Sequence, residues 1–355
     1  MVKGIIMIQI KKYVMTLLVA LLSMSATAAS LSFTKKTTFS LLQLNLWVEC
    51  TRVENAPQYL VEEIARLQPD VATFCELYKG DNDNPVIPYL VKELKLRGIV
   101  YCSARIDGRA VISKFPIVDS QRVNKWLCKV VLNVNGHRVV VYPAHSEYRY
   151  YTCYYPRGYN DGSTDWKKLP APITDVNQML EVCNKSDRVA SMQAFINDAA
   201  EERGKGSMVI MAGDLNEPSC LDWQSNTKDL FEHRGCIVNW SASKLLLDHG
   251  YKDAYRVKHP NAAKFPGFTF PASNANVSPD KLSWAIEADE RERIDFVYYY
   301  PGRNIKVNKA VIAGPALSIV KGERVREISS DKFIEPQNGH WCSDHKGVLV
   351  TFTIK

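Results

Sequence analysis

The chain has 355 residues, of which 46% are hydrophobic and 23% are charged, and its formal net charge is +7. This composition is that of a globular protein, and it excludes a disordered chain, a low-complexity tract and a fibrous repeat. The mild charge does not indicate the clustered basic face that is typical of nucleic-acid-binding domains.

Residues 1–28 have the pattern of a secretory signal peptide. Basic residues precede a short apolar stretch at residues 13–24, and a small-residue cleavage motif ends at Ala28. A transmembrane anchor would need about 20 apolar residues, which is more than this stretch provides. Cleavage would remove three lysines and no acid, which lowers the net charge to +4. We therefore expect a mature domain of residues 29–355, without a transmembrane segment, in a secreted or periplasmic protein.

Strand-like and helix-like patterns alternate along the rest of the chain. The first strand is predicted at residues 39–47, a helix with one apolar face at residues 55–66, and a second strand at residues 71–75. A run of strands follows at residues 99–103, 110–113, 117–123, 126–134 and 137–142. Asn135-Gly136 is typical of the tight turn of a hairpin between the last two of these strands.

The second half of the chain continues this alternation. A helix at residues 187–200 precedes a strand that ends at Asp214, and a shorter helix follows at residues 241–249. The last strands are predicted at residues 294–300, 306–313 and 347–352. Because no Pro-, Ser- or Gly-rich linker divides the chain, we expect one α+β domain with a two-sheet β-sandwich core flanked by helices.

Nine cysteines lie in the expected mature chain, an odd number without a C-x-x-C motif. An exported protein can form disulfides, but at least one of these thiols must stay free or pair between chains. Cys75 and Cys102 lie in strand-like surroundings and are interpreted as small core residues. A zinc site at residues 340–345 is disfavoured, because no second pair of ligands has a matching spacing.

Polar residues that suit metal and phosphate chemistry recur at or next to the ends of the predicted strands. They are Asn45, Glu76, His145, Asp214, Asn216, Asp295, Asp344 and His345. Side chains at the mouth of buried strands are held rigidly, as such chemistry requires. Carboxylate and amide oxygens without soft ligands suit a hard cation, Mg²⁺ above all, with Mn²⁺ and Ca²⁺ as alternatives. Histidines among such acids can donate hydrogen bonds to a phosphate in its transition state.

The order of these residues resembles the endonuclease/exonuclease/phosphatase superfamily, the DNase I-like metal-dependent phosphoesterases, and looks like a secreted bacterial branch of it. The matching blocks are Leu44 to Trp47, Pro69 to Leu77, Gly108 to Ile117, His145, Gly213 to Asn216, Ile294 to Tyr298 and Ser343 to His345. Each block alone is weak, because such short strings recur by chance, whereas their full order is specific. The resemblance implies a DNase I-like fold of four layers.

The resemblance also implies a role for each polar residue. The metal site would consist of Asn45, Glu76 and Asp344, with Glu76 as the principal ligand. The catalytic residues would be His145, Asp214, Asn216, Asp295 and His345. Asp214 would position the attacking water, Asn216 and the two histidines would hold the phosphate, and Asp295 would orient His345. Ser146 follows His145 where the family usually has Leu, which is a departure from the pattern.

Several of these residues also have a purely structural interpretation. Asn45 could cap a turn, and Glu76 could be a solvated strand end. His145 could be hydrogen-bonded without a catalytic role, and Asp295 could form a surface ion pair with Arg291 or Arg293.

A long segment after His145, at residues 147–166, is rich in aromatic residues. Such an insertion predicts a lid or a pocket wall, with simple packing of its tyrosines as the alternative. The candidate substrate-contacting residues are Tyr148, Tyr151, Trp223, Tyr255 and Arg256.

The sequence therefore predicts an exported Mg²⁺-dependent phosphoesterase that hydrolyses a phosphodiester or phosphomonoester by metal-assisted in-line attack of water. A small-molecule or lipid-headgroup substrate is favoured over nucleic acid, because nucleic-acid affinity depends strongly on Lys and Arg contacts to phosphates. The alternatives are a secreted nuclease that acts on DNA or RNA, and a non-catalytic binding module with the same fold. Loss of Glu76, Asp214 or His345 would have indicated the binding module, and all three are present.

Overall fold

The computed structural model describes residues 36–78, 85–302 and 304–355. The expected signal peptide, residues 1–28, lies outside the described residues, as does the start of the expected mature domain. Within the described ranges, no helix has the length and apolar character needed to cross a membrane.

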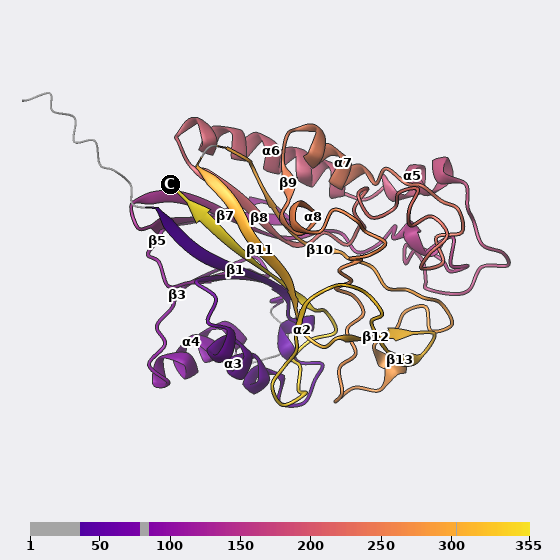
Figure 1. Cartoon of the computed structure of the whole chain (residues 1–355), viewed down its shortest axis with the longest axis horizontal. Coiled ribbons are helices and arrows are strands. Elements are labelled where there is room, and N and C mark those ends of the chain that lie inside the picture. Colours follow the sequence, from indigo (N-terminus) through magenta and orange to yellow (C-terminus); the bar gives the residue numbers. More distant parts are fainter. Residues whose placement is uncertain (1–35, 79–84, 303) are drawn as a thin grey trace, which may run out of the picture. The chain divides into compact units, whose positions relative to one another are not determined.

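Two β-sheets lie face to face at the centre (Figure 1). One sheet has seven strands in the order β14-β11-β15-β1-β2-β4-β3. Their bounds are Thr37–Asn45 for β1, Val71–Cys75 for β2, Cys102–Ile106 for β3, Arg109–Ser113 for β4, Ile305–Ala313 for β11, Phe333–Ile334 for β14 and Gly347–Ile354 for β15.

The second sheet has six strands in the order β5-β6-β7-β8-β10-β9. Their bounds are Ile117–Asn124 for β5, Leu127–Val134 for β6, His137–His145 for β7, Met208–Asp214 for β8, Lys252–Asp253 for β9 and Asp295–Tyr299 for β10. A separate hairpin pairs β12 (Leu317–Val320) with β13 (Glu323–Arg326).

Side chains alternate between the two faces of each strand, and in the central strands both faces are covered. In β1, Leu41 enters the apolar layer between the two sheets, where it joins Val141 and Ile210 of the second sheet. Leu42 and Leu44 point to the opposite face and join a different hydrophobic cluster. Both faces of the seven-stranded sheet are therefore buried at its centre, around β1.

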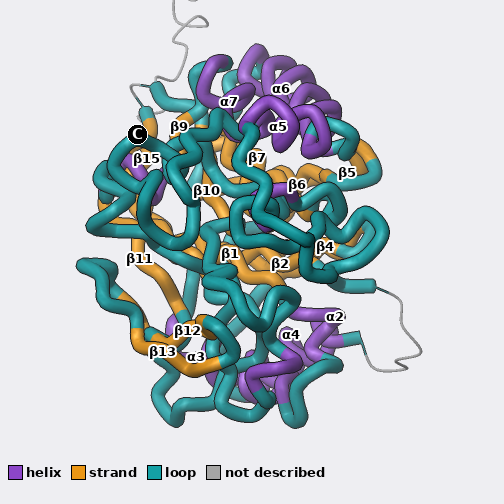
Figure 2. The backbone as a smooth tube through the Cα atoms, turned by 90° about the vertical axis from the view of Figure 1, so that its right-hand side faces the viewer, coloured by secondary structure: helices purple, strands orange, loops and turns teal. Residues whose placement is uncertain are grey.

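Helices cover the outer faces. Helices α3 (Ala56–Leu67) and α4 (Val86–Leu96) pack on the seven-stranded sheet, and α6 (Arg188–Gly204) and α7 (Ser241–Asp248) pack on the six-stranded sheet. Figure 2 shows α3 and α4 on one side of the strands and α6 and α7 on the other. The predicted α+β sandwich with four layers is confirmed.

The structure contains short helices that the sequence patterns did not indicate. They are α2 (Trp47–Cys50), η2 (Thr152–Tyr154), α5 (Val176–Cys183), α8 (Ala254–Lys258) and η3 (Pro279–Lys281). The longer helix α4 was also missed, because Pro88 lies in its first turn, where proline is tolerated but reads as a break.

The aromatic segment after β7 folds into a core of its own. Tyr154, Tyr155 and Tyr159 are buried in one cluster with Trp223 and Trp240. Helix α5 closes this core, and Asp175 caps its start by accepting hydrogen bonds from two backbone amides. The prediction of a lid is therefore wrong for these tyrosines, and the packing alternative applies.

Candidate active site

The register of the strands gathers the predicted polar residues at one end of the sandwich. In the parallel pair β1 and β2, Asn45 lies opposite Cys75, which precedes Glu76. In the parallel pair β7 and β8, His145 lies opposite Asp214, and Asp295 of β10 lies opposite Asp214 from the antiparallel side. Strand β15 begins two residues after His345 and runs antiparallel to β1. Strands that end and strands that begin therefore meet at the same edge.

Asn45 connects the acids of the two sheets. Its fully buried Nδ2 group lies 3.0 Å from Oε1 of Glu76 and 3.0 Å from Oδ2 of Asp214. Its Oδ1 accepts a hydrogen bond from the amide of Trp47 at 2.9 Å. Asn45 therefore supports both acids through its N–H group, and its oxygen, which has a second lone pair, stays a predicted member of the metal site.

A left-handed turn holds the carboxylate of Glu76. All four residues of α2 (Trp47–Cys50) have positive φ angles, which costs L-residues roughly 1–2 kcal/mol each. This turn directs the amide of Val48 to Oε2 of Glu76 at 2.8 Å. Glu49 is buried and accepts two hydrogen bonds from Arg105, at 2.7 and 3.1 Å. The ion pair thus stabilises a strained backbone whose N–H group orients a predicted metal ligand.

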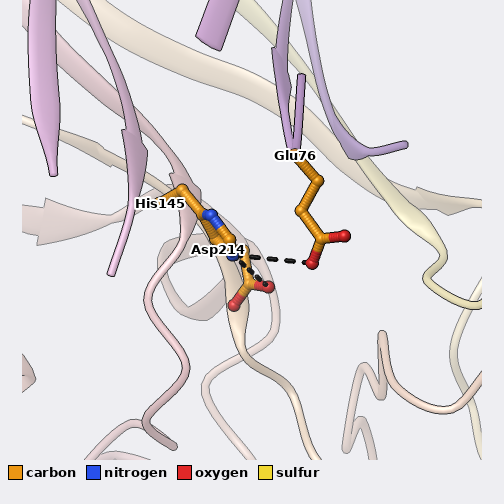
Figure 3. Close-up of side chains that lie close together, drawn as sticks. All are labelled: Glu76, His145 and Asp214. Atoms are coloured by element: carbon orange, nitrogen blue, oxygen red, sulfur yellow. Dashed lines mark ion pairs between the residues drawn. The ribbon is translucent and has the colours of Figure 1, made fainter. Parts of the chain in front are cut away.

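One ring nitrogen of His145 faces the carboxylates of both Glu76 and Asp214 (Figure 3). Its Nε2 is 3.6 Å from Oε1 of Glu76 and 3.9 Å from Oδ2 of Asp214. Nδ2 of Asn216 lies 3.3 Å from the same Nε2. Nδ1 of His145 is 2.8 Å from the hydroxyl of Tyr78, so the ring is held on both sides.

Ser146, the departure from the family pattern, contributes through its backbone. Its carbonyl accepts a hydrogen bond from Nδ2 of Asn216 at 3.1 Å, and its amide donates to the carbonyl of Asp214 at 3.0 Å. Its hydroxyl is buried and has no partner among the described residues. The contacts that Ser146 makes would therefore be available to any side chain at this position.

His345 has a carboxylate partner. Its Nδ1 lies 2.9 Å from Oδ2 of Asp295, whose Oδ1 accepts a hydrogen bond from Nε2 of Gln43 at 3.0 Å. Nε2 of His345 then lies 3.8 Å from Oδ2 of Asp214 and 4.0 Å from Oδ1 of Asp344. Asp295 is fully buried, so the interpretation of a surface ion pair is wrong for this residue.

The pKa values of the two histidines are shifted in opposite directions. Burial lowers the pKa of His145. Burial opposes protonation of His345 as well, but the charge and hydrogen bond of Asp295 raise the pKa of His345 well above its ordinary value. In this arrangement, the proton is held on His345 and the His145 imidazole stays neutral near pH 7.

The acids at this edge form a centre that fits a divalent cation. Glu76, His145 and Asp214 offer ligand atoms within 4.8 Å of one another, and so do Asp214, Asp295 and His345. Burial raises the pKa of Asp214 to about 7, with the nearby charge of Asp295 as the next cause, and burial also raises the pKa of Asp344 to about 7. Crowded, buried carboxylates of this kind are stabilised in their ionised form by a hard cation, which prefers oxygen ligands.

Four of the five predicted substrate-contacting residues are not at an open surface. Tyr151 and Trp223 are buried in the aromatic core, and Tyr255 is buried and hydrogen-bonded to Asp331. Arg256 is buried and forms an ion pair with Asp222 at 2.5 Å. These four side chains are packed in the interior of the protein, and the prediction that they contact a substrate is wrong. Only the fifth, Tyr148, is exposed.

The sequence analysis missed three residues of this site. Tyr78 and Gln43 contact His145 and Asp295 directly, and Val48 contributes its backbone amide. Tyr78 lies two residues after Glu76 and Gln43 two residues before Asn45, so proximity to a matching block was the one available signal.

Comparison with known proteins identifies related sequences. The sequence matches the model of the Endonuclease/Exonuclease/phosphatase family over residues 42–345. An uncharacterized Caenorhabditis elegans protein, F14F9.5, is 26% identical over 279 residues, which cover 76% of this chain and 81% of the relative. The predicted superfamily is confirmed.

Solved structures share the fold. A protein of the endonuclease/exonuclease/phosphatase family from Leptotrichia buccalis is 16% identical, with a TM-score of 0.50 over 88% of this chain and 98% of that chain. TDP2 from D. rerio, complexed with single strand DNA product, is 15% identical, with a TM-score of 0.48 over 89% of this chain and 99% of that chain. At 16% identity, the likeness to the Leptotrichia buccalis structure shows the fold alone.

The predicted preference for a small-molecule or lipid phosphate ester over nucleic acid is wrong. One of the similar structures, that of D. rerio TDP2, contains a single strand DNA product. The prediction had relied on the mild net charge, which describes the whole chain and does not constrain the local field at one site. The aromatic segment, which was predicted to form a lid or a pocket wall, is packed into a core and gives no support to a small-molecule pocket.

Proposed function

Because the chain belongs to the Endonuclease/Exonuclease/phosphatase family and is a metal-dependent phosphoric ester hydrolase, we propose that it hydrolyses a phosphodiester with Mg²⁺ as its metal. One observation carries this proposal. Asn45 joins Glu76 and Asp214 at 3.0 Å each, and the Nε2 atoms of His145 and His345 lie within 4 Å of the same Asp214 oxygen. Carboxylates that can bind a cation and imidazoles that can bind a phosphate therefore lie close together around one oxygen of Asp214.

The chain's own residues have distinct tasks in this proposal. Asp214 positions the attacking water and accepts its proton, which the raised pKa of this carboxyl favours. His345, oriented by Asp295, donates a hydrogen bond to an oxygen of the phosphate, and Asn216 and His145 bind the others. A divalent cation held by Glu76 and Asp344 would neutralise the charge that develops on the phosphate. Water attacks phosphorus in line with the leaving oxygen, and no covalent intermediate is needed.

The charge balance favours a diester over a monoester. In the described part of the chain, no Lys or Arg side chain is hydrogen-bonded or ion-paired to Glu76, Asp214, Asp295 or Asp344. A phosphomonoester brings close to two negative charges at neutral pH, whereas a phosphodiester brings one. One divalent cation, when bound, and the imidazolium of His345 would offset these charges, so binding a diester would leave less uncompensated negative charge than binding a monoester.

The proposal is tested with bis-p-nitrophenyl phosphate, p-nitrophenyl phosphate and plasmid DNA, each with Mg²⁺ or with EDTA. We expect Mg²⁺-dependent hydrolysis of the first substrate to exceed that of the second, and the loss of both activities in Asp214→Ala and His345→Ala. Turnover of the monoester alone would refute the diester proposal. Activity in EDTA, or activity that survives in both variants, would refute the proposed site. Cleavage of the plasmid would place a nucleic acid among its diester substrates.

We also propose that residues 1–28 are a signal peptide and that the chain is exported, as in a secreted bacterial branch of the family. The support is the apolar stretch at residues 13–24 and the small-residue motif that ends at Ala28. The intact mass of the exported protein tests this, with a start at residue 29 as the expected result. An intact N-terminus would contradict it.

A further inference from the structure

Two buried cysteines from distant parts of the chain lie side by side. Cys50 ends the left-handed turn α2, and Cys342 lies in the loop that supplies Asp344 and His345. Cys50 is 2% exposed, Cys342 is fully buried, and both belong to the same hydrophobic cluster. The neighbouring Cys342 thiol is also the largest cause of the raised pKa of the Cys50 thiol.

Backbone contacts bring the two segments to the same place at the end of β1. The amide of Cys50 donates to the carbonyl of Leu46 at 2.6 Å. Ser343, which follows Cys342, donates its hydroxyl to the carbonyl of Asn45 at 2.7 Å. Cys50 and Ser343, the neighbour of Cys342, are therefore anchored to consecutive carbonyls of residues 45–46, which brings the two cysteine-bearing segments together.

We propose that Cys50 and Cys342 form a disulfide when the chain folds under oxidising conditions. A low-molecular-weight disulfide, here oxidised glutathione, is the oxidant. One cysteine thiolate attacks a sulfur of the oxidant and releases one glutathione thiol, and the other cysteine attacks the mixed disulfide and releases the second. The two cysteines lose two protons and two electrons, and the S–S bond of glutathione is reduced to two thiols.

The bond forms during folding and is then protected. The neighbouring Cys342 thiol, together with burial, raises the pKa of the Cys50 thiol, so little thiolate is present once the chain has folded. Exchange with soluble thiols also needs access to the sulfur atoms, which burial denies. A disulfide made early would therefore resist reduction in the native protein.

The disulfide would connect two segments of the active site. The turn that contains Cys50 directs the amide of Val48 to Glu76, and the loop that contains Cys342 continues into Asp344 and His345. The bond would close a loop that spans most of the chain, and long loops gain most from closure in the chain-entropy model.

A second pair of cysteines in one cluster is a weaker candidate. Cys153 and Cys183 both lie in the aromatic core. The sulfur of Cys183, however, lies 3.3 Å from a carboxylate oxygen of Glu217 and 3.4 Å from Nη1 of Arg188. That thiol already has polar partners, whereas the side-chain contact of Cys50 is with Cys342.

The test is a map of the disulfides in the full chain. The chain is unfolded in reductant, refolded in a mixture of reduced and oxidised glutathione, blocked with N-ethylmaleimide and digested without reduction. We expect a linked pair of peptides that contain Cys50 and Cys342, with a mass two hydrogens below the sum of the two thiol peptides. Blocked thiols at both positions, or a link from either cysteine to another, would overturn the proposal.

Melting temperatures provide a second readout on the refolded protein. After reduction in denaturant and refolding in reductant, we expect the wild type to melt about 4–10 °C lower than its oxidised form. This difference should vanish in Cys50→Ser and in Cys342→Ser, and it should persist in Cys102→Ser, whose cysteine is exposed. A redox-dependent difference that remains in Cys50→Ser would refute the assignment. Neither readout uses catalysis, so the result is independent of the proposed function.

Discussion

The hydroxyl of Tyr78 lies 2.8 Å from Nδ1 of His145, so the partner of this histidine is a neutral phenol. The other histidine of the site, His345, has the carboxylate of Asp295 at 2.9 Å. A carboxylate stabilises an imidazolium, whereas a phenol supplies no charge for it. The two imidazoles therefore hold different protonation states within one site, one as a cationic donor and one as a neutral group that binds phosphate.

Tyr78→Phe should lower kcat by about 10-fold to 100-fold, because loss of an orienting partner frees the ring of His145. The KM should change much less, since the other phosphate-binding groups remain. Steady-state kinetics on bis-p-nitrophenyl phosphate measure both constants. Tyr89→Phe, on α4, is the matched control and should match the wild type. An unchanged kcat in Tyr78→Phe would show that the hydrogen bond does not position His145 for catalysis.

His345→Gln should lower kcat by about 10²–10³, as expected when one hydrogen-bond donor to the transition state is lost. The variant retains a neutral donor but loses the positive charge that Asp295 supports. His249→Gln is the matched control, because His249 is exposed and lies at the end of α7. Equal losses in the two variants would point to a general effect of the substitution and not to the site.

The stability of the metal-free protein should fall as the pH rises through the titration of Asp214 and Asp344. Burial raises the pKa of each to about 7, so the folded protein binds these protons more tightly than the unfolded chain does. Their contribution to stability is full below about pH 4 and is lost as the pH passes 7. In EDTA, the melting temperature of the wild type should therefore decline more steeply over about pH 5–8 than that of Asp214→Asn. Parallel curves for the two proteins would contradict the raised pKa of Asp214.

Mg²⁺ should raise the melting temperature more at pH 8 than at pH 6. The cation competes with protons for the same carboxylates, so its apparent affinity should fall by up to about tenfold per pH unit for each proton displaced. Differential scanning fluorimetry over a series of Mg²⁺ concentrations measures this effect. The same series with Glu76→Gln is the control, and the shift should be much smaller there. A shift that is independent of pH would indicate that the cation binds elsewhere.

Gly213→Ala should destabilise the protein strongly. A Cβ atom at Gly213 would lie 2.1 Å from the carbonyl oxygen of Ala144 in the neighbouring strand, and backbone cannot move aside as a flexible side chain can. We expect a loss of about 1–3 kcal/mol in the free energy of unfolding, or more if the strands separate. Gly204→Ala at the end of α6 is the control, because no atom lies within 4 Å of its added Cβ. Urea unfolding compares the two.

Trp223→Ala should cost about 3–5 kcal/mol of stability, because the side chain is fully buried in the aromatic core. Tyr148→Ala should leave the free energy of unfolding within about 0.5 kcal/mol of the wild type, because the side chain is exposed. Urea unfolding measures both. A small effect of Trp223→Ala would reopen the interpretation of this residue as part of a binding surface.

The sequence by itself determined the elements and the chemistry of the site. The strand at residues 71–75 and the helices at residues 55–66 and 187–200 follow from periodicity, which is a local property of the chain. The eight polar residues were found because they lie at or next to either end of an apolar run, with Asp295, Asp344 and His345 near the start of one. The strand predicted at residues 39–47 shows the limit of this reasoning, because β1 stops at Asn45 and the chain then enters the left-handed turn.

The tertiary structure alone decided which side chains face one another. The contact of Tyr78 with His145 and that of Cys50 with Cys342 depend on how distant segments pack, and no local pattern encodes them. The same holds for the aromatic segment, whose tyrosines are apolar enough for a core and polar enough for a lid. The segment is buried because Trp223 and Trp240, which lie far along the chain, pack against it. Periodicity reports the neighbours along a chain, whereas burial and pairing are set by the neighbours in space.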